Sequence, residues 1–365
     1  MKRIVILGNG RQGRTAGEFL IKRGIDVTIV DINKDNLKEA EKNGFKVIPS
    51  DLSKRENIVE VLKTCNIAIS ALPAYLGRNA ELAAIEARRN LIDLTYLKEE
   101  PLELYKKAKE REIVIIPDAG VAPGLSNLIA GYLYSYFDQL NYLKVLVGGI
   151  PKENIPPLGY TITWSPEDLI AEYSRSARIK KDGKILEVPS LSGIEEIHWE
   201  GMNNLEAFYT DGLRTLLKTF KDVENMEEKT IRYSGHAKKI KFLFDIGYFS
   251  DKCNGTSPRK VSLCLLKRLS KLPVKDIVLL RVIGRGRKDG KNEEVIYEVF
   301  DRADEKHSAM ERTTGYTCAM FAYLLLKGEI DKFGVLPPET LGMDEMLFKE
   351  SLSLLHEEGI ELVRK

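Results

Sequence analysis

The sequence predicts an α/β protein in which a doubly wound parallel sheet precedes a second, α+β domain built on a mixed sheet. Two observations predict the first part. Short β-branched runs alternate with helical segments up to about residue 117, and the motif Gly8-Asn9-Gly10-Arg11-Gln12-Gly13 follows the first run. A third observation predicts the second part, because beyond residue 124 the strands lengthen and hairpin turns replace crossovers.

Six strands are expected in the first domain: Ile4–Leu7, Val27–Val30, Phe45–Ile48, Ile67–Ile69, Leu91–Leu94 and Ile113–Ile116. Five helices lie between them. Ser53 and Glu56 have the spacing of a capping box, and Pro101 suits the first turn of a helix. Six strands with five helices form the Rossmann fold, so the first domain is expected to bind a dinucleotide.

The second domain carries local signals of a helix and of two hairpins. Ser165 is expected to cap a helix that starts at Pro166, with Trp164 packing on Leu169. Asp182-Gly183 and Asp289-Gly290 are typical of two-residue hairpin turns. The stretches on either side of each turn are expected to form a pair of antiparallel strands.

Three segments follow from these patterns. Residues 1–124 are expected to form the dinucleotide domain, and residues 125–330 a domain for substrate binding and oligomerisation. Residues 331–365 are expected to be helical and to pack back on the first domain. The helix expected over Thr314–Leu326, rich in small and apolar residues, is placed between the domains.

The three glycines of the motif have separate duties. Gly8 makes the tight turn, Gly10 lets backbone N–H groups approach a pyrophosphate, and Gly13 lets the helix press on the strand. The amino-terminus of that helix supplies donors and partial positive charge. The alternative is a purely structural turn with Asp31 capping the next helix, which the coincidence of four features disfavours.

Asp31 ends the second strand, where a carboxylate accepts from both ribose hydroxyls of NAD and repels a 2′-phosphate. NAD is therefore expected rather than NADP, although Arg11 lies where a guanidinium reaches a 2′-phosphate. The residues expected to bind the cofactor are Gly8, Gly10, Arg11, Gln12, Gly13, Asp31, Ala71, Leu72, Pro73, Gly120 and Pro123.

Composition narrows the class of partner. The 365 residues include 56 Lys+Arg and 54 Asp+Glu, so the net charge of +2 favours a small molecule over nucleic acid or an anionic membrane. Four cysteines form no C-x-x-C pair, and no histidine has metal-ligand spacing, so neither disulfides nor a metal are expected. No signal peptide or membrane span is expected, which places the protein in the cytoplasm.

Beyond residue 114 the chain carries more specific segments: Ile115–Gly124, Gly148–Pro151, Pro156–Leu158, Thr161–Pro166, Glu187–Ser192, Lys229–His236, Arg312–Thr317 and Gly334–Glu339. In these segments the sequence resembles the saccharopine dehydrogenase-like proteins, and within them the lysine 6-dehydrogenases. The resemblance runs over nearly the whole chain. It implies NAD-linked oxidation of the terminal amine of L-lysine to a semialdehyde that cyclises to piperideine-6-carboxylate, by a homo-oligomer that we expect to be a homodimer. A saccharopine dehydrogenase, a related amino-acid or polyamine-precursor oxidoreductase, and a non-catalytic dinucleotide sensor are the alternatives.

Amine oxidation requires a proton acceptor, because the ordinary pKa of a lysine ammonium is about 10.4 and only the uncharged amine gives up hydride. His236 is the first candidate because its side chain titrates near neutrality, and Asp118 is the second. A buried or capping role for His236 is an equal alternative.

The substrate carboxylate calls for a planar guanidinium, which Arg232 or Arg312 would supply. Thr313 and Tyr96 are expected to line the same site. For Tyr96, packing at an interface is the stronger alternative.

Overall fold

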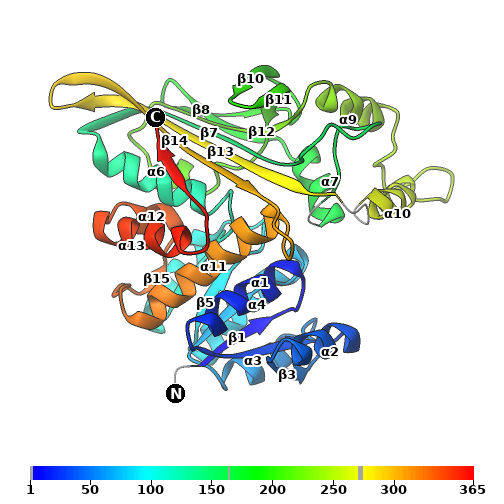
Figure 1. The fold of residues 1–365 in the computed structure, drawn as a ribbon, viewed down its shortest axis with the longest axis vertical. Helices are drawn as coiled ribbons and strands as arrows, with labels where there is room; N and C mark the ends of the chain where they lie inside the picture. Colours follow the sequence, from blue (N-terminus) through cyan, green and yellow to red (C-terminus); the bar gives the residue numbers. More distant parts are fainter. Residues whose placement is uncertain (1–2, 163–164, 270–273) are drawn as a thin grey trace. The chain divides into compact units, whose positions relative to one another are not determined.

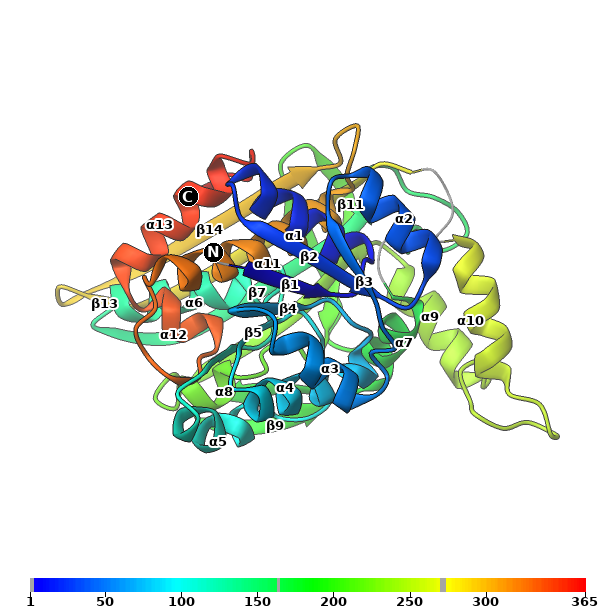
Figure 2. The same cartoon turned by 90° about the horizontal axis from the view of Figure 1, so that it is seen from below.

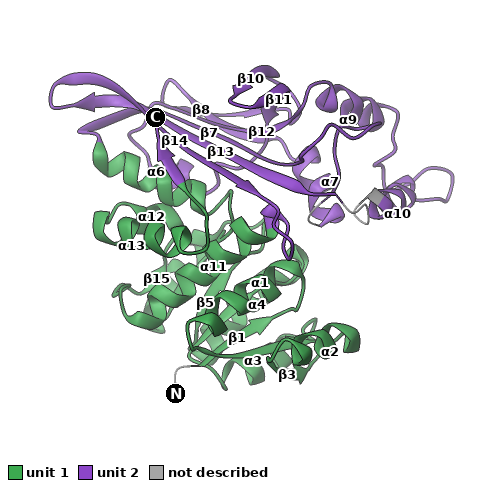
Figure 3. Cartoon of the chain, in the orientation of Figure 1, with its two compact units in different colours: residues 1–136, 311–361 green, residues 137–310, 362–365 purple. Residues whose placement is uncertain are grey.

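The computed structural model describes residues 3–162, 165–269 and 274–365. Its fold is α/β, with one parallel sheet and one mixed sheet, as the sequence predicts. The chain divides into two compact units, which Figure 3 shows in different colours. Unit 1 comprises residues 1–136 and 311–361, and unit 2 comprises residues 137–310 and 362–365. These bounds differ from the expected ones at 124 and 330, because both ends of the chain contribute to unit 1.

Unit 1 contains a seven-stranded parallel sheet in the order β15-β6-β5-β4-β1-β2-β3 (Figure 1). Its strands are β1 (Arg3–Leu7), β2 (Asp26–Asp31), β3 (Lys46–Pro49), β4 (Ile67–Ser70), β5 (Asn90–Asp93), β6 (Val114–Ile116) and β15 (Gly334–Val335). All six predicted strands are present. The seventh, β15, comes from the far end of the chain and pairs with β6.

The helices of unit 1 are α1 (Arg11–Lys22), α2 (Lys34–Lys42), α3 (Arg55–Leu62), α4 (Ala74–Ala87), α5 (Tyr105–Glu110), α6 (Leu125–Tyr136), α11 (Ala309–Lys327, from residue 311), α12 (Pro338–Gly342) and α13 (Glu345–His356). A 3₁₀ turn, η1 (Pro101–Leu104), starts at the predicted proline. Figure 2 shows α3 and α4 on one side of the parallel strands and α1 with α11 on the other. The sheet is therefore covered on both faces, which explains why its strands are nearly continuous apolar runs.

One local prediction for this unit is wrong. Ser53 does not cap α3: the N-cap is Lys54, with no side-chain cap, and the Ser53 hydroxyl donates to Asp51 Oδ1 at 2.6 Å. A competing acceptor two residues away draws the hydroxyl from the helix.

Unit 2 is a nine-stranded mixed sheet in the order β10-β11-β12-β7-β13-β14-β16, with β8 pairing β12 and β9. The strands are β7 (Gln139–Pro151), β8 (Ala177–Lys181), β9 (Lys184–Val188), β10 (Glu195–Trp199), β11 (Met202–Tyr209), β12 (Asn225–Tyr233), β13 (Asp276–Lys288), β14 (Lys291–Arg302) and β16 (Leu362–Arg364). Both predicted hairpins are present, as β8–β9 around Asp182-Gly183 and β13–β14 around Asp289-Gly290. Among the described strands of this sheet, only β7 and β12 pair in parallel.

The helices of unit 2 are α7 (Pro166–Ser174), α8 (Leu216–Thr219), α9 (His236–Asp245) and α10 (Pro258–Leu269). Ser165 caps α7 as predicted, because its hydroxyl accepts from Asp168 N at 3.2 Å. The expected contact of Trp164 lies outside the described residues. Among the helices that the structure describes, none is both long and apolar enough to cross a lipid bilayer.

Candidate active site

The turn between β1 and α1 contains three glycines, and at two of them a larger residue does not fit. Gly8 has a φ of +98°, and a Cβ there would lie 2.8 Å from Ala71 O. A Cβ on Gly13 would lie 2.3 Å from Gly8 O, so α1 approaches the turn at backbone distance. Gly10 is different, because a Cβ there would have no atom within 4 Å. Packing therefore requires Gly8 and Gly13, whereas Gly10 leaves open space at the start of α1.

The amino-terminus of α1 fits an anionic group. Gly10 is the N-cap residue, no side chain caps the helix, and the first turn contains no acidic residue. Asn9 is buried, and its Oδ1 has no hydrogen-bond partner in the described part of the chain. Backbone donors and the helix dipole at such an end favour phosphate. The residues present therefore fit the pyrophosphate of a dinucleotide.

Asp31 is fixed at the carboxyl end of β2. Its Oδ2 accepts from Asn9 N at 2.8 Å and from Asn36 Nδ2 at 3.0 Å, and its Oδ1 accepts from Asn33 N at 2.7 Å. The carboxylate thus joins the glycine turn to α2. Its place beside the turn suits the ribose hydroxyls of a dinucleotide.

Further candidates for cofactor contact lie at this turn, namely Arg11 and the loop of Ala71, Leu72 and Pro73. Ala71 N donates to Leu7 O at 2.9 Å, so the loop after β4 crosses the end of β1. Arg11 is half exposed, and its Nε lies 3.5 Å from Glu311 Oε1. Leu72 and Pro73 complete the loop, and Pro73 is the N-cap residue of α4. The structure therefore brings the predicted loop and the glycine motif together.

Acidic side chains gather beneath the carboxyl edge of the same sheet. Asp93 ends β5, where its carboxylate accepts from Thr95 N at 3.1 Å and from Thr95 Oγ1 at 2.7 Å. Burial raises the pKa of Asp93. Burial also raises the pKa of Glu81 on α4, and the nearby charge of Asp93 raises it further. Asp118 follows β6, is 2% exposed and has a φ of 52°. Burial therefore disfavours the charged forms of Glu81 and Asp93.

Residues 118–124 form a tight turn in front of α6. Ala119 N donates to Asp93 O at 2.9 Å, and Gly120 N donates to Pro123 O at 3.1 Å. A Cβ on Gly124 would lie 1.9 Å from Gly120 O. The turn therefore holds Asp118 at the end of the sheet.

Arg312 and Thr313 lie on α11 in unit 1. The Arg312 Nη2 donates to Glu358 O at 2.9 Å, and its guanidinium lies over the ring of Tyr316, 5.7 Å from the centroid. Thr313 is fully buried, and its backbone carbonyl accepts from Thr317 Oγ1 at 2.6 Å. Tyr96 is half-buried in the loop after β5. These three residues share the unit with the glycine turn.

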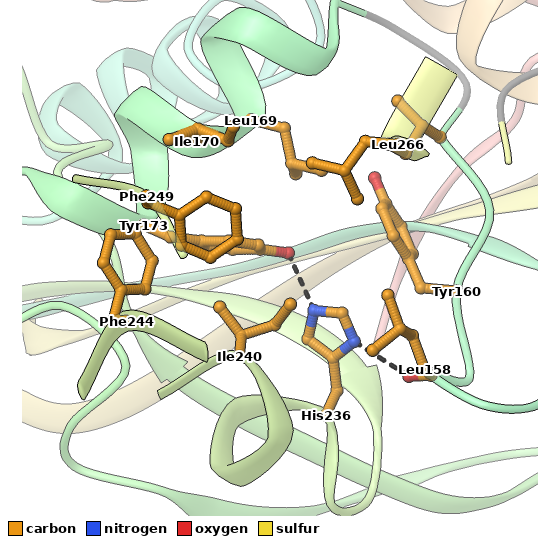
Figure 4. Close-up of a pocket in the computed structure, with 11 residues that line it drawn as sticks. Leu158, Tyr160, Leu169, Ile170, Tyr173, His236, Ile240, Phe244, Phe249 and Leu266 are labelled. Carbon is orange, nitrogen blue, oxygen red and sulfur yellow. Dashed lines mark hydrogen bonds between the residues drawn. The ribbon is translucent and has the colours of Figure 1, made fainter. Parts of the chain in front are cut away.

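Arg232 and His236 lie in unit 2, where Tyr173 of α7 contacts both of them. Figure 4 shows Tyr173 and His236. Tyr173 Oη lies 3.1 Å from Arg232 Nε and 3.0 Å from His236 Nε2, and His236 Nδ1 lies 2.9 Å from Leu158 O. A carbonyl only accepts, so Nδ1 carries the proton and Tyr173 donates to Nε2. The guanidinium also lies over Tyr160, 4.5 Å from its ring centroid.

This geometry corrects the expectation that His236 titrates near neutrality. The side chain is 1% exposed, and burial, with the charge of Arg232, lowers the pKa of His236 to about 3. Both ring nitrogens are engaged, so the imidazole has no lone pair for a substrate proton. His236 is instead a buried histidine at the start of α9, which is the alternative role expected for it.

Sequence reasoning missed the polar residues that accompany Arg232. Glu228, Thr230 and Arg232 alternate along β12, and Glu172 and Tyr173 face them from α7. All three residues of β12 are buried. The available signal was a polar residue at every second position of a strand, from Glu228 to Arg232.

Two family models match the chain. Residues 4–116 match the model described as the saccharopine dehydrogenase NADP binding domain, and residues 120–360 match the saccharopine dehydrogenase C-terminal domain.

Similar proteins bear related names. A saccharopine dehydrogenase [NADP(+), L-glutamate-forming] of Pyricularia oryzae is 24% identical over 69% of this chain and 59% of its own length. The Saccharomyces cerevisiae protein of that name is 25% identical over 69% of this chain and 60% of its own. An alpha-aminoadipic semialdehyde synthase of Arabidopsis thaliana is 22% identical over 69% of this chain and 27% of its own. The chain thus spans less than two thirds of the length of these relatives.

A solved structure shares the fold. Apo histidine-tagged saccharopine dehydrogenase (L-Glu forming) from Saccharomyces cerevisiae superposes with a TM-score of 0.81 at 21% identity, over 100% of this chain and 99% of that chain. The arrangement of both sheets is therefore that of a known fold.

Proposed function

The chain belongs to the saccharopine dehydrogenase family, and on this premise we propose that it is a nicotinamide-dependent oxidoreductase acting on a carbon–nitrogen bond of an amino acid. The observation that carries the proposal is the open position at Gly10 in front of an uncapped helix, with the Asp31 carboxylate beside it. These residues would hold the pyrophosphate and a ribose of the dinucleotide, whose nicotinamide would supply the hydride acceptor or donor.

L-Lysine is the proposed substrate. Its terminal ammonium loses a proton and the adjacent carbon loses a hydride, which gives an iminium. Water converts the iminium to the semialdehyde and ammonium, and the semialdehyde cyclises to piperideine-6-carboxylate with loss of water. The motifs from Ile115 to Glu339 support this choice through their resemblance to lysine 6-dehydrogenases. Saccharopine is the second candidate, and the names of the relatives support it.

Asp118 is the proposed proton acceptor, since His236 is neutral and fully engaged. It is held at the carboxyl edge of the parallel sheet, where ligands of such folds bind. For the substrate carboxylate we propose Arg312 with Thr313, because Arg232 already lies 3.8 Å from the Glu172 carboxylate and donates to Tyr173.

NAD is the proposed cofactor, because a carboxylate at Asp31 opposes a 2′-phosphate. The NADP-binding description of the family model and the names of the relatives support NADP as the second candidate. The expected homodimer and cytoplasmic location stay predictions.

One experiment tests these assignments together. Purified protein is mixed with L-lysine or saccharopine and with NAD or NADP, and the absorbance of the reduced nicotinamide is followed from neutral to alkaline pH. Formation of NADH with lysine supports the proposal, and faster reduction with saccharopine favours the second candidate. No reduction with either substrate, while the dinucleotide binds, points to a sensor without chemistry.

A further inference from the structure

A line of hydrogen bonds crosses the interior of unit 2. Thr210 Oγ1 lies 2.7 Å from Glu228 Oε2 and 2.7 Å from Thr230 Oγ1, and Thr230 Oγ1 lies 2.8 Å from Glu172 Oε1. Two carboxyl groups are thereby joined through two hydroxyls. The line connects β12, the residue after β11, and α7.

The number of protons on this line decides its charge. Three oxygen–oxygen contacts at 2.7–2.8 Å have the ordinary length of O–H···O hydrogen bonds, and each needs one proton. The two threonine hydroxyls supply only two. If both carboxyls were ionised, one pair of oxygens would face each other with no proton between them. A third proton must therefore reside on Glu228 or Glu172.

We propose that Glu228 and Glu172 share one proton through Thr210 and Thr230, and that this buried proton-binding site fastens α7 to the sheet. With the proton on Glu228, each group donates to the next towards Glu172. With the proton on Glu172, all three bonds reverse. Either arrangement satisfies every contact, so the site binds one proton and carries one negative charge.

Burial and neighbouring charges support this assignment. Glu228 is 3% exposed, and burial raises its pKa to about 8. Burial also raises the pKa of Glu172, whereas the charge of Arg232 lowers it. Asp211 lies near Glu228 but is paired with Arg178 of β8, whose Nε lies 2.9 Å from Asp211 Oδ1. The cation thus lies at the Glu172 end, which places the proton at Glu228.

The backbone around Glu228 is shaped for this side chain. Gly212 N donates to Glu228 Oε2 at 3.1 Å, and a Cβ on Gly212 would lie 2.5 Å from Glu228 Cδ. Glu172 Oε2 is buried, and no hydrogen-bond partner is found for it among the described residues. Glu172 is consequently held by its Thr230 bond and by Arg232, so loss of the shared proton removes part of what anchors α7.

Release of α7 would also disturb the hydrogen bonds among Tyr173, Arg232 and His236. The residue next to Glu172 is Tyr173, which lines the pocket of Figure 4 and joins Arg232 to His236. Loss of the proton at alkaline pH leaves two carboxylates and an unbridged contact, and α7 then separates from β12. The shared proton therefore holds α7 on β12, and alkaline pH releases the helix.

Infrared spectroscopy and pH-dependent unfolding of the full chain test the proposal. Glu172→Gln supplies the third proton permanently from its amide, and Glu228→Gln does the same from the other end with loss of the hydrogen bond that Gly212 N donates to Oε2. Glu224→Gln removes an equal charge from an exposed position of the same region and is the matched control. The measurements are the absorption of protonated carboxyl groups at pH 7 and the urea midpoint from pH 5 to pH 9.

The sign of the pH effect follows from the raised pKa. A carboxyl whose pKa is about 8 when folded and 4.5 when unfolded stabilises the fold below pH 4.5, and that stability is lost as the pH rises to 8. Glu81 in unit 1 acts in the same direction, so the comparison between variants carries the test.

We expect the wild type and Glu224→Gln to lose stability in parallel on alkalinisation, and Glu228→Gln to lose less. We also expect the protonated-carboxyl absorption to decrease in Glu228→Gln and in Glu172→Gln. If one variant fails to fold, the other gives the spectroscopic answer. Should the absorption and the pH slope be the same in wild type and in a folded variant, the shared proton does not exist.

Discussion

Substitution of Gly10 by alanine separates cofactor binding from folding, because Gly10 is the one glycine of the motif with open space around it. Its φ of −68° and ψ of 178° are accessible to alanine, and a Cβ meets no atom within 4 Å. A substitution without strain changes stability by about 0.5 kcal/mol or less. The methyl group would instead occupy the space at the helix end that the pyrophosphate requires.

The expected loss of affinity follows from the contacts displaced. A hydrogen bond to a charged group contributes roughly 1.5–3 kcal/mol, so losing one weakens dinucleotide binding roughly 10- to 150-fold. Isothermal titration with NAD and with NADP measures this, and urea unfolding of the same preparation measures stability. Gly13→Ala is the matched contrast, because its Cβ would lie 2.3 Å from Gly8 O and overpacking there costs about 1–3 kcal/mol of folding free energy.

The result that would refute this reasoning is a folded Gly10→Ala protein that binds both dinucleotides as tightly as the wild type. The pyrophosphate would then lie elsewhere than on α1.

Three more predictions rest on other contacts. Asp31→Asn removes the charge that opposes a 2′-phosphate, so the ratio of NADP to NAD affinity should rise about tenfold, and an unchanged ratio in paired titrations would show that Asp31 does not select the cofactor. His236→Asn should flatten the acid side of the stability profile. Because the pKa of His236 is lowered, the free energy of unfolding decreases as the pH is lowered from 6.5 to about 3, by up to about 1.4 kcal/mol per pH unit. Urea midpoints over that range show whether this slope persists in the variant. Gly131→Ala should destabilise unit 1 by roughly 3 kcal/mol, since its Cβ would lie 2.0 Å from Glu339 O; a melting temperature equal to that of the wild type would contradict the close approach of α6 and α12.

Local signals predicted much of the fold. The six β-branched runs became strands because their residues suit a sheet buried on both faces, and each Asp-Gly pair became a hairpin because both residues adopt positive φ. β15 was missed, since a strand of two residues, Gly334–Val335, has no periodicity to detect. Its pairing with β6 is a long-range choice that local sequence does not encode.

The sequence predicted the parts of the candidate site that depend on residues close together in the chain, and it did not predict the parts that depend on distant segments. Gly8, Gly10, Gly13 and Asp31 depend on one turn, and the structure places them together. The environment of His236 depends on α7 and on Leu158, which are remote in sequence, so burial reversed the expected titration. Opposite conclusions about one imidazole thus follow from its residue type and from its surroundings.

The division of unit 1 between residues 1–136 and 311–361 has a consequence for synthesis on the ribosome. The nascent amino-terminal segment emerges without β15, and without α11 to cover the face of the sheet on which α1 lies, so its apolar surface stays exposed while all of residues 137–310 are translated. Domains generally fold as units, the amino-terminal one first. In this chain, by contrast, unit 2 has all of its residues except 362–365, which include β16, before unit 1 is complete.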